Sequence, residues 1–252
     1  MNILGLEAST RRASIAVVRS GGAPAETVLP DDRSASAQLV PALDGLLKKC
    51  GLAAGDLDGI AVGIGPGSFT GIRICLATAR GFSAARGTPI RGVCGFDALV
   101  AEFFEPAGAR EDGIPSPPFS PGGGGAGSER GAARLCVVAD AHSHGLYAAV
   151  YVRDGGKYRR AQEPFVCRPD ALPGRIEGEV FFLGPHLDRF REPLAKLFAG
   201  RASFDTENRF PSATAAALLF ESPSAVRDDP PGAVAPLYLL PGVRVKPAGG
   251  GA

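Results

Sequence analysis

One segment in the first third of the chain places a strand, a glycine turn and a helix in direct succession. The apolar run Gly59–Val62 predicts a buried strand, and the Gly65–Gly67 stretch, Gly-Pro-Gly, predicts a tight turn. Ser68 and Thr70 stand where a hydroxyl can cap the first turn of a helix, and Gly87 is suited to end that helix. The amino end of such a helix can hold an anion.

The same helix carries a stripe of small residues. Gly71, Cys75, Ala79 and Ser83 recur every four positions, and residues four apart share one helix face. Another helix could therefore approach this face closely. Because the Gly65–Gly71 segment lacks the Lys-Ser/Thr ending of a P-loop, a Walker-type nucleotide site is disfavoured. A phosphate cradle and a helix-packing surface remain the two hypotheses for this segment.

Composition limits the functional classes. The 252 residues can bury a full core as one large domain or two lobes, and the net charge of +1 argues against a protein that binds nucleic acid alone. The five cysteines form no Cys-x-x-Cys motif, which indicates reduced thiols in a cytoplasmic protein. The amino terminus lacks the pattern of a signal peptide, and no apolar run approaches the ~18 residues that would span a membrane.

The two halves of the chain begin alike. An apolar strand at 3–6 is followed by Glu7, a polar turn and a returning strand, and a second apolar strand at 135–139 is followed by Asp140, a turn and a strand at 145–152. This internal duplication resembles the actin-like, sugar-kinase-like ATPases, in which two such hairpins face each other across a nucleotide cleft. We therefore expect an α/β protein of the actin-like/sugar-kinase-like ATPase (ASKHA) fold, with two lobes of duplicated ribonuclease-H-like topology.

The division of the chain follows from its composition. We expect four parts, which are an amino-terminal lobe at 1–105, a flexible Gly- and Pro-rich insertion at 106–133, a carboxy-terminal lobe at 134–229 and a Pro- and Gly-rich tail at 230–252. Hydrophobic spacing further predicts helices at 35–50, at 95 to about 104, near 185–198 and near 212–221, and strands at 89–94 and 180–183.

Four polar residues of the two hairpins are candidates for a nucleotide or metal cleft: Glu7, Ser9, Thr10 and Asp140. The two carboxylates could hold magnesium between the lobes, because hard cations prefer carboxylate oxygens. The alternative is that they are structural turn acids, and the sequence favours it because the other parts of such a site are missing. The second half has no convincing Gly-Gly pair to clamp adenosine outside the insertion.

No catalytic residue and no metal site is assigned. His142 and His144 place two imidazoles close together, but two ligands do not make a zinc site and no third stands nearby. The chain has no Gly-x-Ser-x-Gly elbow and no evident Ser, His and acid constellation.

Two neighbouring helices carry more apolar residues than one buried face requires. The helix at 68–86 is apolar almost all round, and a helix of that kind is either deeply buried or shared with a partner. The helix at 35–50 has an apolar edge as well, so the sequence favours a helical subunit interface. The residues expected there are small or apolar members of these helices: Leu39, Leu43, Leu46, Gly71, Ile72, Cys75, Leu76, Ala79, Phe82 and Ser83.

Residues 65–74, Gly-Pro-Gly-Ser-Phe-Thr-Gly-Ile-Arg-Ile, are similar to the hallmark of the bacterial TsaB family. Further similar stretches cover most of the chain outside the insertion: Ile3–Ser9, Leu39–Pro41, Ala139–Ala141, Pro211–Ala213 and Pro236–Leu239. The chain departs from the family pattern at Glu7, where the opening acid is usually Asp. It also departs at Ala35-Ser36 in place of His-Ser, and at His142 in place of Arg.

The resemblance implies a non-catalytic subunit that forms a heterodimer with the TsaD enzyme. With TsaE and TsaC-type proteins, such subunits help make threonylcarbamoyladenosine beside the anticodon of ANN-decoding tRNAs. It further implies that the two helices form the partner surface and that a TsaE homologue joins the larger complex. The same surface could pair two copies of this chain. tRNA would be contacted only through the complex, without a membrane, and ATP and magnesium would act at the level of the complex only.

Two rival functions stay open. One is a stand-alone ATP-dependent kinase or hydrolase of actin-like fold that uses Glu7 and Asp140. The other is a self-associating homodimer with no enzyme partner. Binding of ATP with magnesium by the isolated chain would distinguish the first, and co-purification from a cell extract would distinguish the second.

Overall fold

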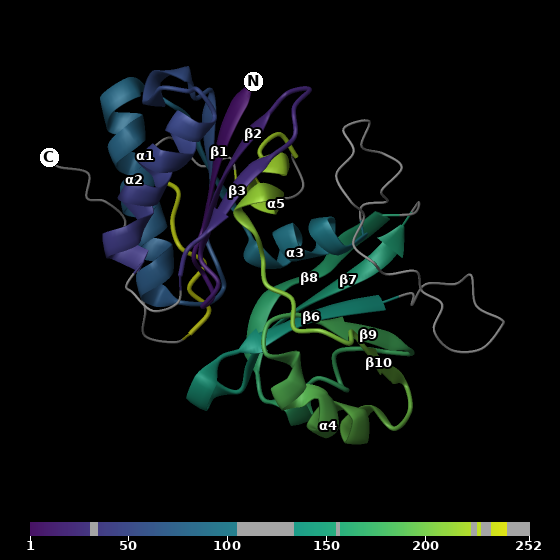
Figure 1. Cartoon of the computed structure of the whole chain (residues 1–252). Coiled ribbons are helices and arrows are strands. Elements are labelled where there is room, and N and C mark those ends of the chain that lie inside the picture. The colour runs from purple at the N-terminus through teal and green to yellow at the C-terminus, as the bar shows by residue number, and fades with distance from the viewer. Residues whose placement is uncertain (31–34, 105–133, 155–156, 223–225, 228–232, 241–252) are drawn as a thin grey trace, which may run out of the picture.

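The computed structural model describes residues 1–30, 35–104, 134–154, 157–222, 226–227 and 233–240. The expected insertion at 106–133 lies outside the described residues, as does most of the expected tail. Two separate β-sheets with flanking helices make up the described chain (Figure 1). Among the described helices, none combines the length and apolar character that crossing a bilayer requires.

The first sheet has the strand order β11-β5-β4-β1-β2-β3. Its strands are β1 (Asn2–Glu7), β2 (Ser14–Arg19), β3 (Ala25–Val28), β4 (Gly59–Gly63), β5 (Ile90–Val93) and β11 (Val226–Arg227). The strands β1, β2 and β3 form an antiparallel meander, whereas β4 and β5 run parallel to β1. The expected hairpin at the amino terminus is confirmed.

The second sheet repeats this arrangement. Its strands are β6 (Arg134–Asp140), β7 (Leu146–Asp154), β8 (Lys157–Cys167), β9 (Val180–Leu183) and β10 (Ala202–Phe204), in the order β10-β9-β6-β7-β8. Apart from β11, this is the order of the first sheet with each strand replaced by its counterpart. Glu7 and Asp140 end the equivalent strands β1 and β6, so the duplicated topology predicted from the hairpins is confirmed.

Helices cover both faces of the first sheet, which is why its central strands are buried throughout. On one face lie α1 (Ala35–Lys49) and α2 (Phe69–Arg86), which share a core with Leu4, Leu6 and other residues of β1, β2 and β4. On the other face lie α3 (Gly95–Phe104) and α5 (Ala213–Leu218), whose core includes Ile3. Figure 1 shows α3 and α5 between the two sheets and α1 and α2 on the outside.

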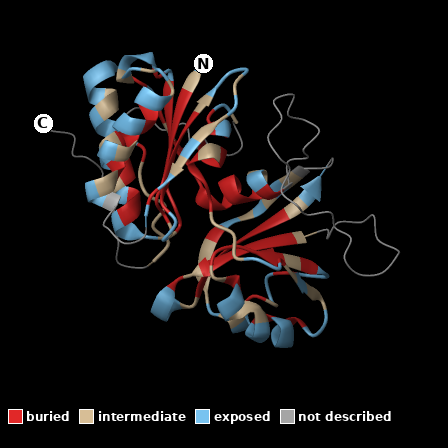
Figure 2. Cartoon of the chain, viewed as in Figure 1, coloured by how far each residue is buried: buried red, intermediate tan, exposed pale blue. Residues whose placement is uncertain are grey.

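The second sheet has one described α-helix on its outer face. This helix, α4 (Leu187–Phe198), shares a core with β6 and β9 in which Phe182 and Phe198 meet edge to face. Short 3₁₀ turns occupy Ala54–Asp56, His142–His144 and Pro169–Ala171. Figure 2 shows that the central strands of both sheets are buried.

Local capping sets the bounds of α2. The Ser68 Oγ accepts a hydrogen bond from the Gly71 amide at 3.2 Å, and Gly87 adopts a left-handed conformation while its amide donates to the Ser83 carbonyl. These are the N-cap and C-cap that the sequence predicted, and Thr70 takes no part in the cap that the structure describes.

The expected boundary of the carboxy-terminal lobe is wrong for its last part. The helix α5 packs on β1, β2 and β4, and β11 pairs with β5, so both elements return to the first lobe. The physical reason is size. A Cβ on Gly5 would overlap the Ala213 carbonyl oxygen, and the Ala213 amide donates to the Ser14 Oγ at 2.9 Å. Only a helix of small residues can approach the sheet this closely.

Candidate functional site

Glu7 ends β1 inside the first lobe, and its side chain is fully buried. The Oε1 atom accepts a hydrogen bond from the Ser9 amide at 2.6 Å, whereas Oε2 has no hydrogen-bond partner among the described residues. Desolvation raises the pKa of this carboxyl from 4.5 to about 7, against the lowering effect of the hydrogen bond from the Ser9 amide. A Cβ on Gly63 would overlap Oε2, so β4 needs glycine where it passes this acid.

The glycine turn before α2 packs against the turn that follows β1. The Ser68 amide donates to the Ser9 carbonyl at 2.6 Å, and a Cβ on Gly67 would overlap that same oxygen. The Gly71 amide is bonded to its own cap. Because amides at the amino end of α2 are already used inside the chain, this geometry favours the packing hypothesis over the phosphate cradle.

Asp140 occupies the same topological place in the second lobe but has charged partners. Its Oδ1 accepts a hydrogen bond from the His142 amide at 2.8 Å, and its Oδ2 forms an ion pair with Arg189 of α4. The His142 ring lies 3.5 Å from Oδ2 and is almost wholly exposed. His144 is exposed as well and contacts Ser143.

The remaining cleft candidates do not complete a site. Ser9 is buried and its Oγ has no partner among the described residues, while the Thr10 hydroxyl is 3.4 Å from the Arg12 carbonyl. In the described part of the chain, no three His, Cys, Asp or Glu side chains are grouped to hold a metal ion. A buried carboxyl with a raised pKa and a carboxylate already paired with arginine do not fit magnesium well, because the ion needs ionised oxygens free to coordinate it.

The residues expected at a partner interface mostly lie inside the first lobe, where they are buried in the free chain. Seven of them belong to the hydrophobic core and are at most 3% exposed: Leu39, Leu43, Leu46, Ile72, Cys75, Leu76 and Ala79. Gly71 is buried too, since a Cβ there would overlap the Ala8 carbonyl oxygen, and Phe82 and Ser83 are half-buried. The small-residue stripe therefore packs against the lobe's own sheet and the α1 helix.

The outer faces of the same two helices are exposed. They carry small or apolar residues at the positions between the buried ones: Ala37, Val40, Pro41 and Gly45 on α1, and Phe69, Ala77, Gly81 and Ala84 on α2. Val40 is 55% exposed and Phe69 43%. We call these eight residues the outer helical face. The sequence held the signal for it, because the spacing from Ala77 to Gly81 and Ala84 is as helical as that of the buried stripe.

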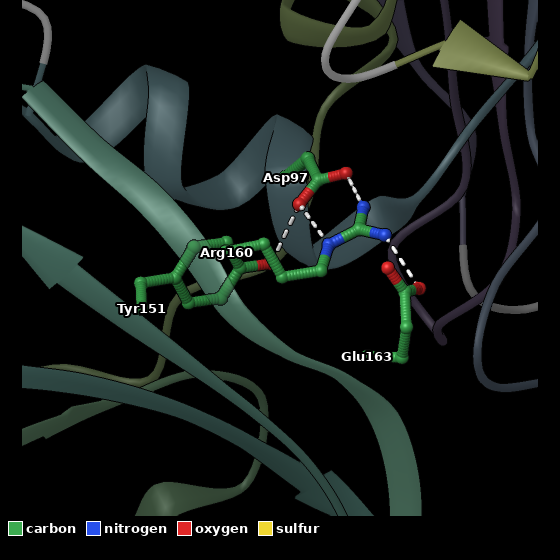
Figure 3. A network of polar contacts seen from close by, with 4 residues as sticks. All are labelled: Asp97, Tyr151, Arg160 and Glu163. Carbon is green, nitrogen blue, oxygen red and sulfur yellow. Dashed lines mark hydrogen bonds and ion pairs between the residues drawn. The ribbon is translucent and has the colours of Figure 1, made fainter.

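A polar network joins α3 to the second sheet (Figure 3). The carboxylate of Asp97 accepts hydrogen bonds from the Tyr151 hydroxyl at 2.7 Å and the Arg160 Nε at 3.1 Å, and it forms an ion pair with the Arg160 guanidinium. The Arg160 Nη1 donates a hydrogen bond to the Glu163 Oε2 at 2.8 Å. Since α3 also packs on α5, this network connects the two lobes. It was not foreseen from the sequence, in which Asp97 lies 54 positions from Tyr151 and 63 from Arg160.

Comparison with known proteins agrees with the resemblance inferred from residues 65–74. Residues 22–114 match the family model described as TsaD, tRNA N6-adenosine threonylcarbamoyltransferase. The chain is 34% identical to the Bacillus subtilis tRNA threonylcarbamoyladenosine biosynthesis protein TsaB over 119 residues. The aligned region covers 47% of this chain and 50% of that protein. The chain is 26% identical over 178 residues to the Escherichia coli protein of the same name, which covers 70% of this chain and 67% of that one.

The fold has a close solved counterpart. The structure of YeaZ from Pseudomonas aeruginosa superposes with a TM-score of 0.67 at 22% identity, over 94% of this chain and 99% of that chain. The two repeated sheets and this likeness confirm the actin-like fold. The chain spans 40% to 50% of the length of the first curated relatives that it matches. The chain is therefore similar, over part of its length, to two proteins named TsaB.

Proposed function

We propose that the chain is a non-catalytic subunit that pairs with a TsaD homologue and supports threonylcarbamoyladenosine formation on tRNA. The observation that carries this proposal is the similarity to proteins named for threonylcarbamoyladenosine biosynthesis. In the wider assembly, a TsaE homologue joins the pair, tRNA is bound by the complex, and two copies of this chain can associate through the same surface when the enzyme is absent.

The state of the two hairpin acids supports a non-catalytic role. Glu7 lies in a dry interior with a raised pKa, and Asp140 is held by Arg189 and the His142 amide. Phosphoryl transfer requires several groups placed together around the phosphates and their metal ion. The chain on its own therefore needs no ATP or magnesium, and any nucleotide acts at the level of the complex.

On the two helices expected to form the interface, the outer helical face is the side that a partner can reach. Its small residues leave the helix backbones accessible, so a partner helix can pack closely without displacing large side chains. The buried residues first expected at the interface take a supporting role, since they hold α1 and α2 against the sheet.

The test uses two exposed alanines on different helices. Ala77→Arg on α2 is compared with Ala195→Arg on α4, and each variant is co-expressed with a TsaD homologue and analysed by gel filtration. We expect Ala77→Arg to abolish the heterodimer and the threonylcarbamoyladenosine yield, while Ala195→Arg leaves both at the wild-type level. Thermal unfolding of the free chains checks that both variants stay folded.

A second pair of variants tests the absence of catalysis. Glu7→Gln and Asp140→Asn keep the size of each side chain, and we expect both to retain pairing and most of the threonylcarbamoyladenosine yield. A hundredfold loss of yield in a variant that still folds and still pairs would contradict the proposal and favour a nucleotide site at the hairpins.

A further inference from the structure

A segment without helix or strand, residues 233–240, runs beside α2 and is bonded to it through Arg73 and Arg80 (Figure 1). The Leu237 amide donates to the Ile64 carbonyl at 2.8 Å, and the Val234 carbonyl accepts a hydrogen bond from Arg80 at 2.8 Å. Val234 is buried in the core of the first lobe, whereas Leu237 also contacts the core of the second. This part of the chain is therefore held firmly beside α2, although it comes from the far end of the sequence.

Tyr238 of this segment completes an aromatic and cationic cluster with two residues of α2. The rings of Phe69 and Tyr238 stack with centroids 5.2 Å apart, and the Arg73 guanidinium lies 3.8 Å from the centroid of Phe69. The Arg73 Nε donates to the Tyr238 hydroxyl at 2.9 Å. Arg73 is exposed, and its two Nη groups have no acceptor among the described residues.

The two helices of the outer helical face carry an excess of cations. The helices α1 and α2 carry five cations, Lys48, Lys49, Arg73, Arg80 and Arg86, and a single acid, Asp44, which is bonded to Lys48. Five cations and one acid give these two helices a net charge of +4, against +1 for the whole chain. A partner that covers the outer helical face is favoured if it presents negative charge.

We propose that the Phe69–Arg73–Tyr238 cluster is a carboxylate-binding anchor for an acidic surface of the protein that pairs with this chain. Tyr238 is the positioning residue, because its hydroxyl and ring hold the guanidinium so that both Nη groups point to one carboxylate. An arginine fixed in this way loses little side-chain entropy when it binds a carboxylate in two-pronged fashion. This inference rests on the proposed function, since it names the chemistry of the partner at that same face.

A protein carboxylate fits the surface better than a nucleic-acid phosphate. Binding to a phosphate backbone needs clustered cations. Here exposed apolar residues such as Phe69 and Ala77 stand on either side of Arg73 along α2, and a protein surface can bury them. Rigid aromatic and arginine side chains are also the residues that dominate protein interfaces.

The experiment measures the affinity of the full chain for a purified TsaD homologue by calorimetry at low and high salt. The variants are Arg73→Met, Arg73→Lys and Tyr238→Phe. The matched control is Arg175→Met, because Arg175 is also exposed and lies 4.5 Å from the ring of Phe165 on the second sheet. Thermal unfolding of each free chain is recorded alongside.

We expect Arg73→Met to weaken binding roughly tenfold or more at low salt and to reduce the salt dependence of the affinity. Tyr238→Phe should weaken binding about threefold to tenfold, since it removes one hydrogen bond and keeps the stacked ring. Arg73→Lys should fall between wild type and Arg73→Met. In the double variant Arg73→Met/Tyr238→Phe, we expect the loss of affinity to be smaller than the sum of the two single losses. A merely structural role of Tyr238 would give additive losses.

Three results would overturn the inference. If Arg73→Met binds as tightly as Arg175→Met while Ala77→Arg abolishes pairing, the anchor is wrong and the proposed function stands. If neither Arg73→Met nor Ala77→Arg affects pairing, the outer helical face is not the partner surface and the proposed function loses its interface. If Arg73→Met leaves pairing intact but lowers tRNA retention by the complex, the ligand of the cluster is a phosphate.

Discussion

The two sides of α2 carry almost the same kind of residue and have opposite roles in the structure. On the inner side, Gly71, Cys75 and Ala79 lie against β1 and α1 with no exposed surface of note. On the outer side, Ala77 and Gly81 face away from the lobe. Small residues at helical spacing therefore indicate that something packs closely, but they do not say whether it is the protein's own sheet or another molecule.

The largest expected effect comes from placing a charge on the inner side. Ala79→Arg forces a guanidinium into a fully buried position between α2 and its own lobe. We expect a loss of about 4 kcal/mol or more in the free energy of unfolding, or failure to fold. Urea unfolding followed by circular dichroism measures it. A stable Ala79→Arg protein would mean that the inner side is accessible after all.

The buried carboxyl of Glu7, which influences Cys75 on the inner side electrostatically, makes the stability of the chain depend on pH. The folded state keeps the Glu7 proton up to pH about 7, whereas the unfolded chain releases it near pH 4.5. Between these values the unfolded state binds fewer protons, so stability falls as pH rises and levels off above pH 7. We expect wild type to lose about 2 to 3 kcal/mol more than Glu7→Gln between pH 5 and pH 8. The free energy of unfolding of both proteins is measured in urea at each pH. If it changes with pH in the same way for both, Glu7 is not the cause of the pH dependence.

A smaller effect separates two glycines of the same helix. Gly71→Ala should destabilise the chain by about 1 to 3 kcal/mol, because its Cβ overlaps the backbone of Ala8, which cannot move aside cheaply. Gly81→Ala meets nothing within 4 Å, and we expect it to stabilise the helix by about 0.5 to 1 kcal/mol. Thermal unfolding of the two variants side by side checks the sign of each change. If both substitutions change the stability by the same amount, the inner and outer sides of α2 do not differ in how closely they are packed.

Much of the fold could be predicted because its signals are local. The caps at Ser68 and Gly87 depend on neighbours within a few residues, so the bounds of α2 follow from the sequence. The matching hairpins around Glu7 and Asp140 revealed the duplicated topology before any strand order was known. The short strands β3, β8, β10 and β11 were not predicted, because they are half-exposed or very brief and carry weak apolar periodicity.

The candidate site was predictable only in part. The sequence identified the two helices and the two acids, and it favoured structural roles for Glu7 and Asp140. It also placed the interface on the inner residues. Most of those residues are buried in the free chain, and the location of the interface stays a prediction. Ala79 and Ala77 are the same residue type, and only the position of the sheet makes one buried and the other exposed.

The chain's own residues determined where elements begin and end, since capping and turn formation need only adjacent groups. The tertiary structure alone decided which face of α2 is buried, where α5 docks, and that Tyr238 meets Arg73 across 165 positions of sequence. These contacts form between segments that are distant in sequence. They depend on the packing of the whole core, so no single stretch of sequence predicts them.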